Sequence, residues 1–239
     1  MYSFDSRIRY SEVDSQRHVT LPSTIDYFQD CSNFQSEELG VGIDYLMGQG
    51  LAWVLSYWQI EVNRYPQMGE HVKVSTWPYG FQGFFGYRNF TMEDDAGELL
   101  AYANSVWTLL DVKKGRPARL TPEMQQAYQL SAQLAMECES RKVAFPEEME
   151  AREPFPVHKY HIDTNNHVNN GKYVSMAQEY LPAGFCTGKL RVEYRRAAVY
   201  RDMIFPFVAE EQGKITVKLA DEEGKPYAIV ELEEKKCFD

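Results

Sequence analysis

The sequence has little of what marks several large classes of protein. Its four cysteines are scattered with no C-x-x-C pair, so neither a disulfide framework nor a zinc site is predicted, and free thiols in a reducing compartment fit best. No run approaches the ~18 apolar residues of a membrane-spanning helix, and the N-terminus has no apolar signal-peptide region. The five histidines show no metal-ligand spacing. We expect a soluble, cytoplasmic protein with no membrane span, no metal and no cofactor.

Basic residues are also in the minority. Lys and Arg number 25 against 35 Asp and Glu, and the net charge of −10 excludes nucleic acid as an expected partner. Hydrophobic residues make up 44% of the chain and aromatic residues 14%, which is enough for a sizeable core. At 239 residues the chain is one large domain or two small ones, on the usual scale of ~100–200 residues per domain.

One short polar run stands out from the rest of the chain. Residues 163–173 combine a carboxylate, an imidazole and four side-chain amides, and they lead into a segment with helical periodicity. Asn169 or Asn170 is predicted to cap that helix. A helix N-terminus favours negative charge, so an oxyanion could be stabilised there. The alternative is an Asn-rich turn with a capping Asp. The side chains of interest are Asp163, Asn165, His167, Asn169 and Asn170.

A weaker copy of this run lies near the N-terminus. Asp14 aligns with Asp163 and His18 with His167 at one offset, 163 − 14 = 149, and Gln16 aligns with Asn165. Each copy is followed by a predicted helix and then by strands, so we predict two diverged copies of one αβ unit. The first copy lacks the paired asparagines and is predicted to be catalytically silent.

The pattern of apolar residues predicts the main elements. A first helix is expected over residues 22–38, ended by Gly40, and a turn-rich passage over 41–50. A short helix is expected from Thr121, and the second long helix is expected to end near Leu181. The predicted strands are Leu51–Val62, Val72–Trp77, Tyr87–Met92, Leu99–Asp111, Lys189–Tyr194, Met203–Ala209, Lys214–Ala220 and Pro226–Glu233.

The run Asp-x-Asn-x-His-Val-Asn-Asn-x-Lys-Tyr at 163–173 resembles the active-site signature of acyl-ACP thioesterases, which release fatty acids from acyl carrier protein (ACP). The likeness continues through residues 51–54, 64–66, 76–77, 105–107 and 193–196. The resemblance implies an α+β fold of two tandem hotdog domains, each a long central helix wrapped by an antiparallel β-sheet. It favours the bacterial members, because plant members carry an organelle-targeting extension. The expected domains are 1–120 (N-terminal hotdog domain with the acyl-chain pocket), 121–153 (linker) and 154–239 (catalytic C-terminal hotdog domain).

The resemblance also implies roles for single residues. Asp163 would act as base or as nucleophile, His167 would orient the thioester or water, and Asn165 would hold the carbonyl or the base. Asn169, Asn170 and Glu179 would support them. The fullest family signature continues with Glu and Cys where this chain has Ala197 and Ala198, so a Cys–His nucleophile is excluded there. Glu179 could cover for the missing acid; alternatively, it forms an ion pair with Arg195 or Arg196.

The expected function is therefore hydrolysis of fatty acyl-ACP to free fatty acid and holo-ACP. An acyl-CoA thioesterase of the same fold and a non-catalytic acyl-binding protein are the alternatives. ACPs are acidic, so docking on this acidic chain needs a local basic face, predicted at Arg191, Arg195, Arg196 and Arg201. Homodimer formation is left open, as are the length, saturation and branching of the acyl chain.

Overall fold

The computed structural model describes residues 1–235, which form two compact units. The first unit contains residues 1–56 and 62–138. The second contains residues 57–61 and the chain from Glu139 onward. The predicted boundaries at 120 and 153 stay a prediction, but the helix expected from Thr121 is present as α3 (Pro122–Ala127) and belongs to the first unit.

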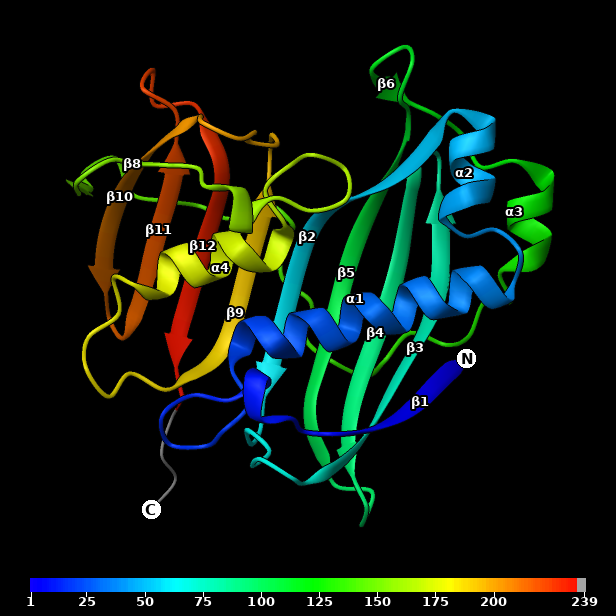
Figure 1. Cartoon of the computed structure of the whole chain (residues 1–239), viewed down its shortest axis with the longest axis horizontal. Helices are drawn as coiled ribbons and strands as arrows, with labels where there is room; N and C mark the ends of the chain where they lie inside the picture. Colours follow the sequence, from blue (N-terminus) through cyan, green and yellow to red (C-terminus); the bar gives the residue numbers. More distant parts are fainter. Residues whose placement is uncertain (236–239) are drawn as a thin grey trace. The chain divides into compact units, whose positions relative to one another are not determined.

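The first unit is an antiparallel sheet with one long helix across it. Strands β1, β3, β4 and β5 pair in succession, β2 lies next to β5, and β6 pairs with the C-terminal end of β5. Helix α1 lies across one face of this sheet (Figure 1). The elements are β1 (Tyr2–Arg7), η1 (Tyr10–Glu12), α1 (Leu21–Glu38), α2 (Ile43–Gln49), β2 (Leu51–Val62), β3 (His71–Gln82), β4 (Phe85–Asp94), β5 (Leu99–Asp111), β6 (Arg116–Pro117) and α3.

Helix α1 has clear start and stop signals in the sequence. The Thr20 side chain accepts a hydrogen bond from the N–H of Ser23, and Pro22 occupies the first turn, where it removes an N–H that would lack a partner. At the other end Gly40 adopts φ +70°, and the N–H of Val41 bonds to the carbonyl of Ser36. The predicted helix is confirmed. Its buried face meets the sheet, where Phe28 packs against Phe90 of β4 with 5.2 Å between ring centroids.

A second apolar cluster in this unit joins α2, α3 and β5. Its buried members are Val41, Leu46, Leu109, Leu120, Met124 and Tyr128. Helix α2 itself was not predicted, because the glycines between 41 and 50 indicate turns. In the structure Gly48 lies inside the helix, and Gly50 ends it with φ +68°.

The second unit repeats the plan with a shorter helix. Residues 57–61 of β2 pair with β9, and the sheet continues in the order β9-β12-β11-β10-β7, with β8 beside β10. Helix α4 lies across the face of this sheet (Figure 1). The elements are β7 (Glu150–Ala151), β8 (Phe155–Pro156), η2 (Lys159–His161), α4 (Asn170–Gln178), β9 (Thr187–Tyr194), β10 (Met203–Glu211), β11 (Lys214–Ala220) and β12 (Pro226–Glu234).

Helix α4 buries Tyr173, Val174 and Ala177, as its periodicity predicts. It ends at Gln178, however, and not near Leu181. Pro182 disfavours helical backbone at the residue before it, and residues 179–181 form turns instead. The bounds predicted for β2, β5 and β11 match the structure, and the other predicted strands are present with longer ends. No helix in the described part of the chain is long and apolar enough to cross a membrane.

Candidate active site

The polar run forms a tight loop between η2 and α4. The N–H of Asp163 donates to the carbonyl of His167 at 2.8 Å, and the N–H of Asn166 donates to the carbonyl of Asp163 at 3.1 Å. Oδ1 of Asp163 accepts from the backbone N–H of Asn165 (2.8 Å) and of His167 (3.4 Å). Asn166 has φ +61°, a conformation that asparagine tolerates better than most residues. The Asp163 carboxylate therefore helps to fold the loop that carries the other two predicted catalytic residues.

Both ends of the loop are anchored. Asn169 caps α4, with its Oδ1 accepting from the N–H of Gly171 at 2.8 Å, which confirms one of the two predicted caps. The N–H of Asn169 donates to the carbonyl of His161 at 2.8 Å. Asp163 is half-buried, whereas Asn165 and His167 are exposed on the loop just before the helix. The predicted residues thus share one short, well-bonded segment at the start of α4.

The segment after β9 runs beside this loop. The Tyr194 hydroxyl donates to the carbonyl of Asn170 at 3.0 Å. The N–H of Ala198 donates to the Tyr173 hydroxyl at 2.8 Å, and its carbonyl accepts from Val168 at 2.9 Å. The places where the fullest signature has an acid and a thiol therefore adjoin the loop, and this chain has only the methyl groups of Ala197 and Ala198 there.

Burial determines the protonation state of three side chains around the loop, those of Tyr173, Tyr194 and His161. It raises the pKa of the Tyr173 and Tyr194 phenols, which therefore stay protonated as hydrogen-bonding groups. Burial, together with His158 and Lys172, lowers the pKa of the His161 imidazole. Nδ1 of His161 accepts from the N–H of His158 at 3.0 Å. His161 thus acts as a neutral support at the base of the loop.

The first copy of the run has the same backbone structure. Oδ1 of Asp14 accepts from the N–H of Gln16 (2.8 Å) and of His18 (3.0 Å), and Arg17 has φ +66° where the second copy has Asn166. Each loop follows a one-turn 3₁₀ helix and is closed by a bridge, Val13 to Val19 in one and Ile162 to Val168 in the other. The predicted internal repeat is confirmed in the structure at a constant offset.

One of the predicted roles outside the loop needs correction. Arg191 is only 6% exposed; it forms ion pairs with Glu139 (3.0 Å) and Glu231 (2.9 Å) and also contacts the Tyr57 hydroxyl. Its charge is compensated inside the unit, so it is not available to a carrier. The prediction of docking stays with Arg195, Arg196 and Arg201, which are exposed.

The ion pair considered for Glu179 is absent. Arg195 pairs with Glu193 at 3.0 Å, and Arg196 pairs with Asp221 at 2.6 Å. Glu179 is exposed at the C-terminal cap of α4, and its supporting role stays a prediction. Cys237 lies outside the described residues.

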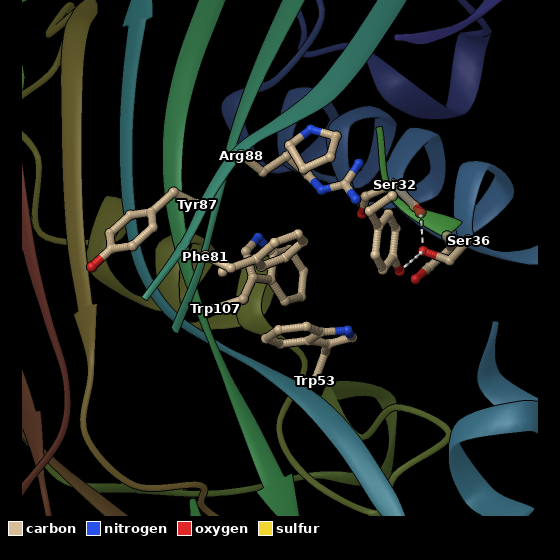
Figure 2. Close-up of a pocket in the computed structure, with 11 residues that line it drawn as sticks. Ser32, Ser36, Trp53, Phe81, Tyr87, Arg88 and Trp107 are labelled. Atoms are coloured by element: carbon tan, nitrogen blue, oxygen red, sulfur yellow. Dashed lines mark hydrogen bonds between the residues drawn. The ribbon is translucent and has the colours of Figure 1, made fainter. Parts of the chain in front are cut away.

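An open pocket lies in the first unit. Figure 2 shows the rings of Trp53, Phe81 and Trp107 gathered around it, with Ser32, Ser36 and the Arg88 guanidinium at another part of its wall. Further lining residues are Asn33, Pro78, Gly86, Tyr87 and Tyr128.

The acyl-chain pocket was expected in the first half of the chain, but Arg88 was not among the predicted site residues. Its burial could have been inferred from the spacing along β4. Arg88 and Phe90 are two residues apart on this strand, so their side chains point to the same face of the sheet, and a large apolar residue such as Phe90 indicates that this face is buried.

Comparison with known proteins agrees with this arrangement. Residues 1–128 match the acyl-ACP thioesterase N-terminal domain family, and residues 145–232 match the corresponding C-terminal domain family. The chain is 27% identical over 207 residues to the chloroplastic acyl-acyl-carrier-protein hydrolase FATB2 of Cuphea viscosissima, covering 79% of this chain and 50% of that protein. The palmitoyl-acyl carrier protein thioesterase of Cuphea hookeriana gives the same identity and coverage. The chain thus spans about half the length of these curated relatives.

Solved structures match nearly the whole chain. An acyl-ACP thioesterase from Bacteroides thetaiotaomicron superimposes with a TM-score of 0.89 at 21% identity, over 98% of this chain and 97% of that one. The 12:0-ACP thioesterase from Umbellularia californica gives a TM-score of 0.85 at 20% identity, over 98% of this chain and 96% of the other. These likenesses confirm the predicted fold of two tandem hotdog domains.

Proposed function

Because the chain belongs to the acyl-ACP thioesterase family, we propose that it hydrolyses the thioester of a fatty acyl chain carried by ACP, releasing a free fatty acid and holo-ACP. The observation that carries the proposal is the loop of Asp163, Asn165 and His167, which is held rigid at the N-terminus of α4. A site of this kind offers a carboxylate, an imidazole and an amide within five residues of one another.

The hydrogen bonds of Asp163 leave one carboxylate oxygen open to a reactant. Two backbone N–H groups donate to its Oδ1, while the structure gives Oδ2 no partner among the described residues. As a base, the carboxylate would take a proton from water while the water oxygen attacks the carbonyl carbon. As a nucleophile, it would itself attack that carbon and expel the carrier thiolate, which leaves a mixed anhydride that a water molecule then hydrolyses to fatty acid and free carboxylate. In both routes the C–S bond breaks and the departing thiolate takes up a proton to become the carrier thiol.

Asn165 and His167 supply the remaining groups. His167 would orient the thioester or the attacking water, and Asn165 would donate to the developing oxyanion or hold the base. Both side chains are exposed, so a substrate can reach them. Their loop needs no further folding, because the bonds described above already fix its backbone.

The pocket of the first unit would hold the acyl chain. Pockets for such ligands are mostly apolar, and the rings of Trp53, Phe81 and Trp107 provide an apolar wall of this kind. The proposal thus assigns chain binding to the first unit and hydrolysis to the second. A cytoplasmic location remains part of the proposal.

A second candidate, a non-catalytic acyl-binding protein, is favoured by one observation: Ala197 and Ala198 leave methyl groups where the family signature has an acid and a thiol. A hydrolysis assay separates the two functions. The purified chain is incubated with acyl-ACPs of graded chain length and with the matching acyl-CoAs, and released acid and thiol are quantified. We expect release from acyl-ACP that is lost in His167→Ala. Binding of the acyl chain without release from either carrier would overturn the proposal.

A further inference from the structure

The pocket of the first unit contains a buried positive charge. Arg88 is 7% exposed and lies in the pocket wall (Figure 2). Its Nη1 donates to Oε1 of Gln35 at 2.5 Å and to Oγ1 of Thr76 at 3.2 Å. The guanidinium carbon also lies 5.6 Å from the centroid of the Tyr128 ring. All three neighbours are electrically neutral.

These contacts leave the charge of Arg88 uncompensated. No carboxylate in residues 1–235 forms an ion pair with it. Arginine stays protonated in proteins, and a buried charge without a counter-ion is costly. Arg191 shows the contrast within the same chain, because that buried guanidinium is paired with Glu139 and Glu231.

Two donor groups of Arg88 are also unused. Only Nη1 makes hydrogen bonds, and Nε and Nη2 have no partner among the described residues. A purely structural role, tying α1 to β3 and β4, is fulfilled by Nη1 alone. The free donors lie on a residue that lines the pocket, so they can reach a ligand inside it.

Other residues make the same part of the wall polar. Ser32, Asn33 and Ser36 come from α1, and the Ser36 hydroxyl is 2.8 Å from that of Tyr128. The Ser32 and Ser36 hydroxyls already donate to the carbonyls of Gln29 and Ser32, at 2.8 and 2.9 Å. The unused donors of Arg88 differ, because a plain hydrocarbon chain would exclude water from them without replacing its hydrogen bonds, which lowers affinity. A chain with an oxygen at this depth would satisfy them.

We propose that the pocket binds an acyl chain bearing an oxygen-containing group (a hydroxyl, oxo or carboxyl group) whose oxygen accepts hydrogen bonds from Nε or Nη2 of Arg88. Arg88 is then a specificity-determining residue of the pocket. The inference rests on the proposed function only in taking the ligand to be an acyl chain.

The test measures binding and needs no turnover. The probes are acyl pantetheine amides, in which nitrogen replaces the thioester sulfur. One has a plain chain, a series carries a hydroxyl at successive carbons, and one ends in a carboxyl. Calorimetry gives the dissociation constant of each for the native protein and for Arg88→Met, which keeps a long apolar side chain. The control is Arg116→Met, on exposed β6.

We expect at least one oxygen-bearing probe to bind the native protein about ten- to a hundred-fold more tightly than the plain chain, the range of a hydrogen bond to a charged group. Arg88→Met should abolish this preference and Arg116→Met should keep it. A native protein that prefers the plain chain over the whole series overturns the inference, as does an unchanged preference in Arg88→Met.

If Arg88→Met does not fold, the crystal structure of the native protein with its best oxygen-bearing probe decides. The probe oxygen within hydrogen-bond distance of Nε or Nη2 supports the inference, and an oxygen bound elsewhere overturns it. The proposed function fails separately, through absent hydrolysis of any acyl-ACP, and that result leaves the binding preference intact as a finding.

Discussion

Asp14 and Asp163 hold their loops in the same way, each through one carboxylate oxygen that accepts two backbone N–H groups. The pairs of distances are 2.8 and 3.0 Å for Asp14 and 2.8 and 3.4 Å for Asp163. The shared loop is therefore not itself the mark of catalysis. What differs is the side chains it presents: Gln16, Arg17 and Thr20 in the first copy stand where the second has Asn165, Asn166 and Asn169.

The first prediction follows from this difference. His18→Ala should leave kcat on acyl-ACP within a few-fold of the native value, because the first copy only contributes structure and chain binding. His167→Ala should lower kcat by ~10²–10⁴, the usual cost of removing a group that manages protons or orients the reactants. Steady-state kinetics on both variants, with circular dichroism to check folding, measures this. Equal losses in the two variants would show that the first copy is catalytic.

The second prediction is that no thiol takes part. Burial raises the pKa of the Cys31 thiol to about 12, and Cys31 donates to the carbonyl of Val74 inside the core of the first unit. Cys138 and Cys186 are exposed. N-ethylmaleimide should therefore label Cys138 and Cys186 and spare Cys31, while kcat stays nearly unchanged. Mass spectrometry reports the sites labelled, and Cys186→Ser is the matched variant. Loss of turnover in step with labelling of one thiol contradicts the prediction.

The third prediction separates two arginines that the sequence grouped together. Arg201→Glu should raise KM for acyl-ACP several-fold and weaken its dependence on salt, because Arg201 is exposed and its guanidinium carbon lies 5.2 Å from the centroid of the uncharged Tyr200 ring. Arg191→Glu should instead destabilise the fold by ~3–5 kcal/mol, since it breaks buried ion pairs. Steady-state kinetics at several ionic strengths test the prediction for Arg201→Glu, and thermal unfolding tests the prediction for Arg191→Glu. Arg116→Glu, on β6, is the charge-matched control and should change neither.

The fourth prediction concerns the size of the pocket. A Cβ on Gly86 would lie 3.1 Å from Cη2 and 3.3 Å from Cζ3 of Trp53, closer than side chains normally pack. Gly86→Ala should therefore push Trp53 into the pocket and shift the released fatty acids towards shorter chains. Gly80→Ala is the control, because its Cβ meets only Tyr87 at an ordinary 3.9 Å. Profiling of the acids released from mixed acyl-ACPs measures the shift. An unchanged profile in Gly86→Ala would place the acyl chain elsewhere.

Local features of this fold could be predicted from the sequence because their causes are local. The Asn169 cap, the stop at Gly40 and the bounds of β2 and β5 each follow from neighbouring residue types. The repeat was visible because the loop needs an Asp that bonds to the backbone two and four residues on, which fixes the spacing. The glycines in residues 41–50 led to a prediction of turns, but the same residues form helix α2 in the structure. Glycine spacing alone does not distinguish the two.

Features that depend on distant residues could not be predicted in the same way. Alternation along β9 places Arg191 on one side of the strand, but nothing nearby shows that Glu139 and Glu231 meet it there. Arg88 is similar, because Gln35 and Thr76 reach it from α1 and β3. The closeness of Ala198 to the loop of residues 163–167 likewise depends on the Tyr173 and Val168 contacts across the fold.

The assignment of Asp163 as the base or nucleophile can be tested with a matched pair of variants. Asn at position 163 keeps an oxygen that accepts from the N–H groups of Asn165 and His167, so the loop should remain, while the carboxylate is lost. Asp14→Asn makes the same change in the first copy. Each variant should lose only about 1 kcal/mol of stability, the scale of one hydrogen bond.

Hydrolysis of acyl-ACP under single-turnover conditions is the direct measurement, made on the native protein, Asp163→Asn and Asp14→Asn. We predict that Asp163→Asn lowers the rate at least ~10²–10⁴-fold with an intact fold, while Asp14→Asn stays within a few-fold of the native rate. A folded Asp163→Asn protein that hydrolyses at the native rate would contradict the assignment.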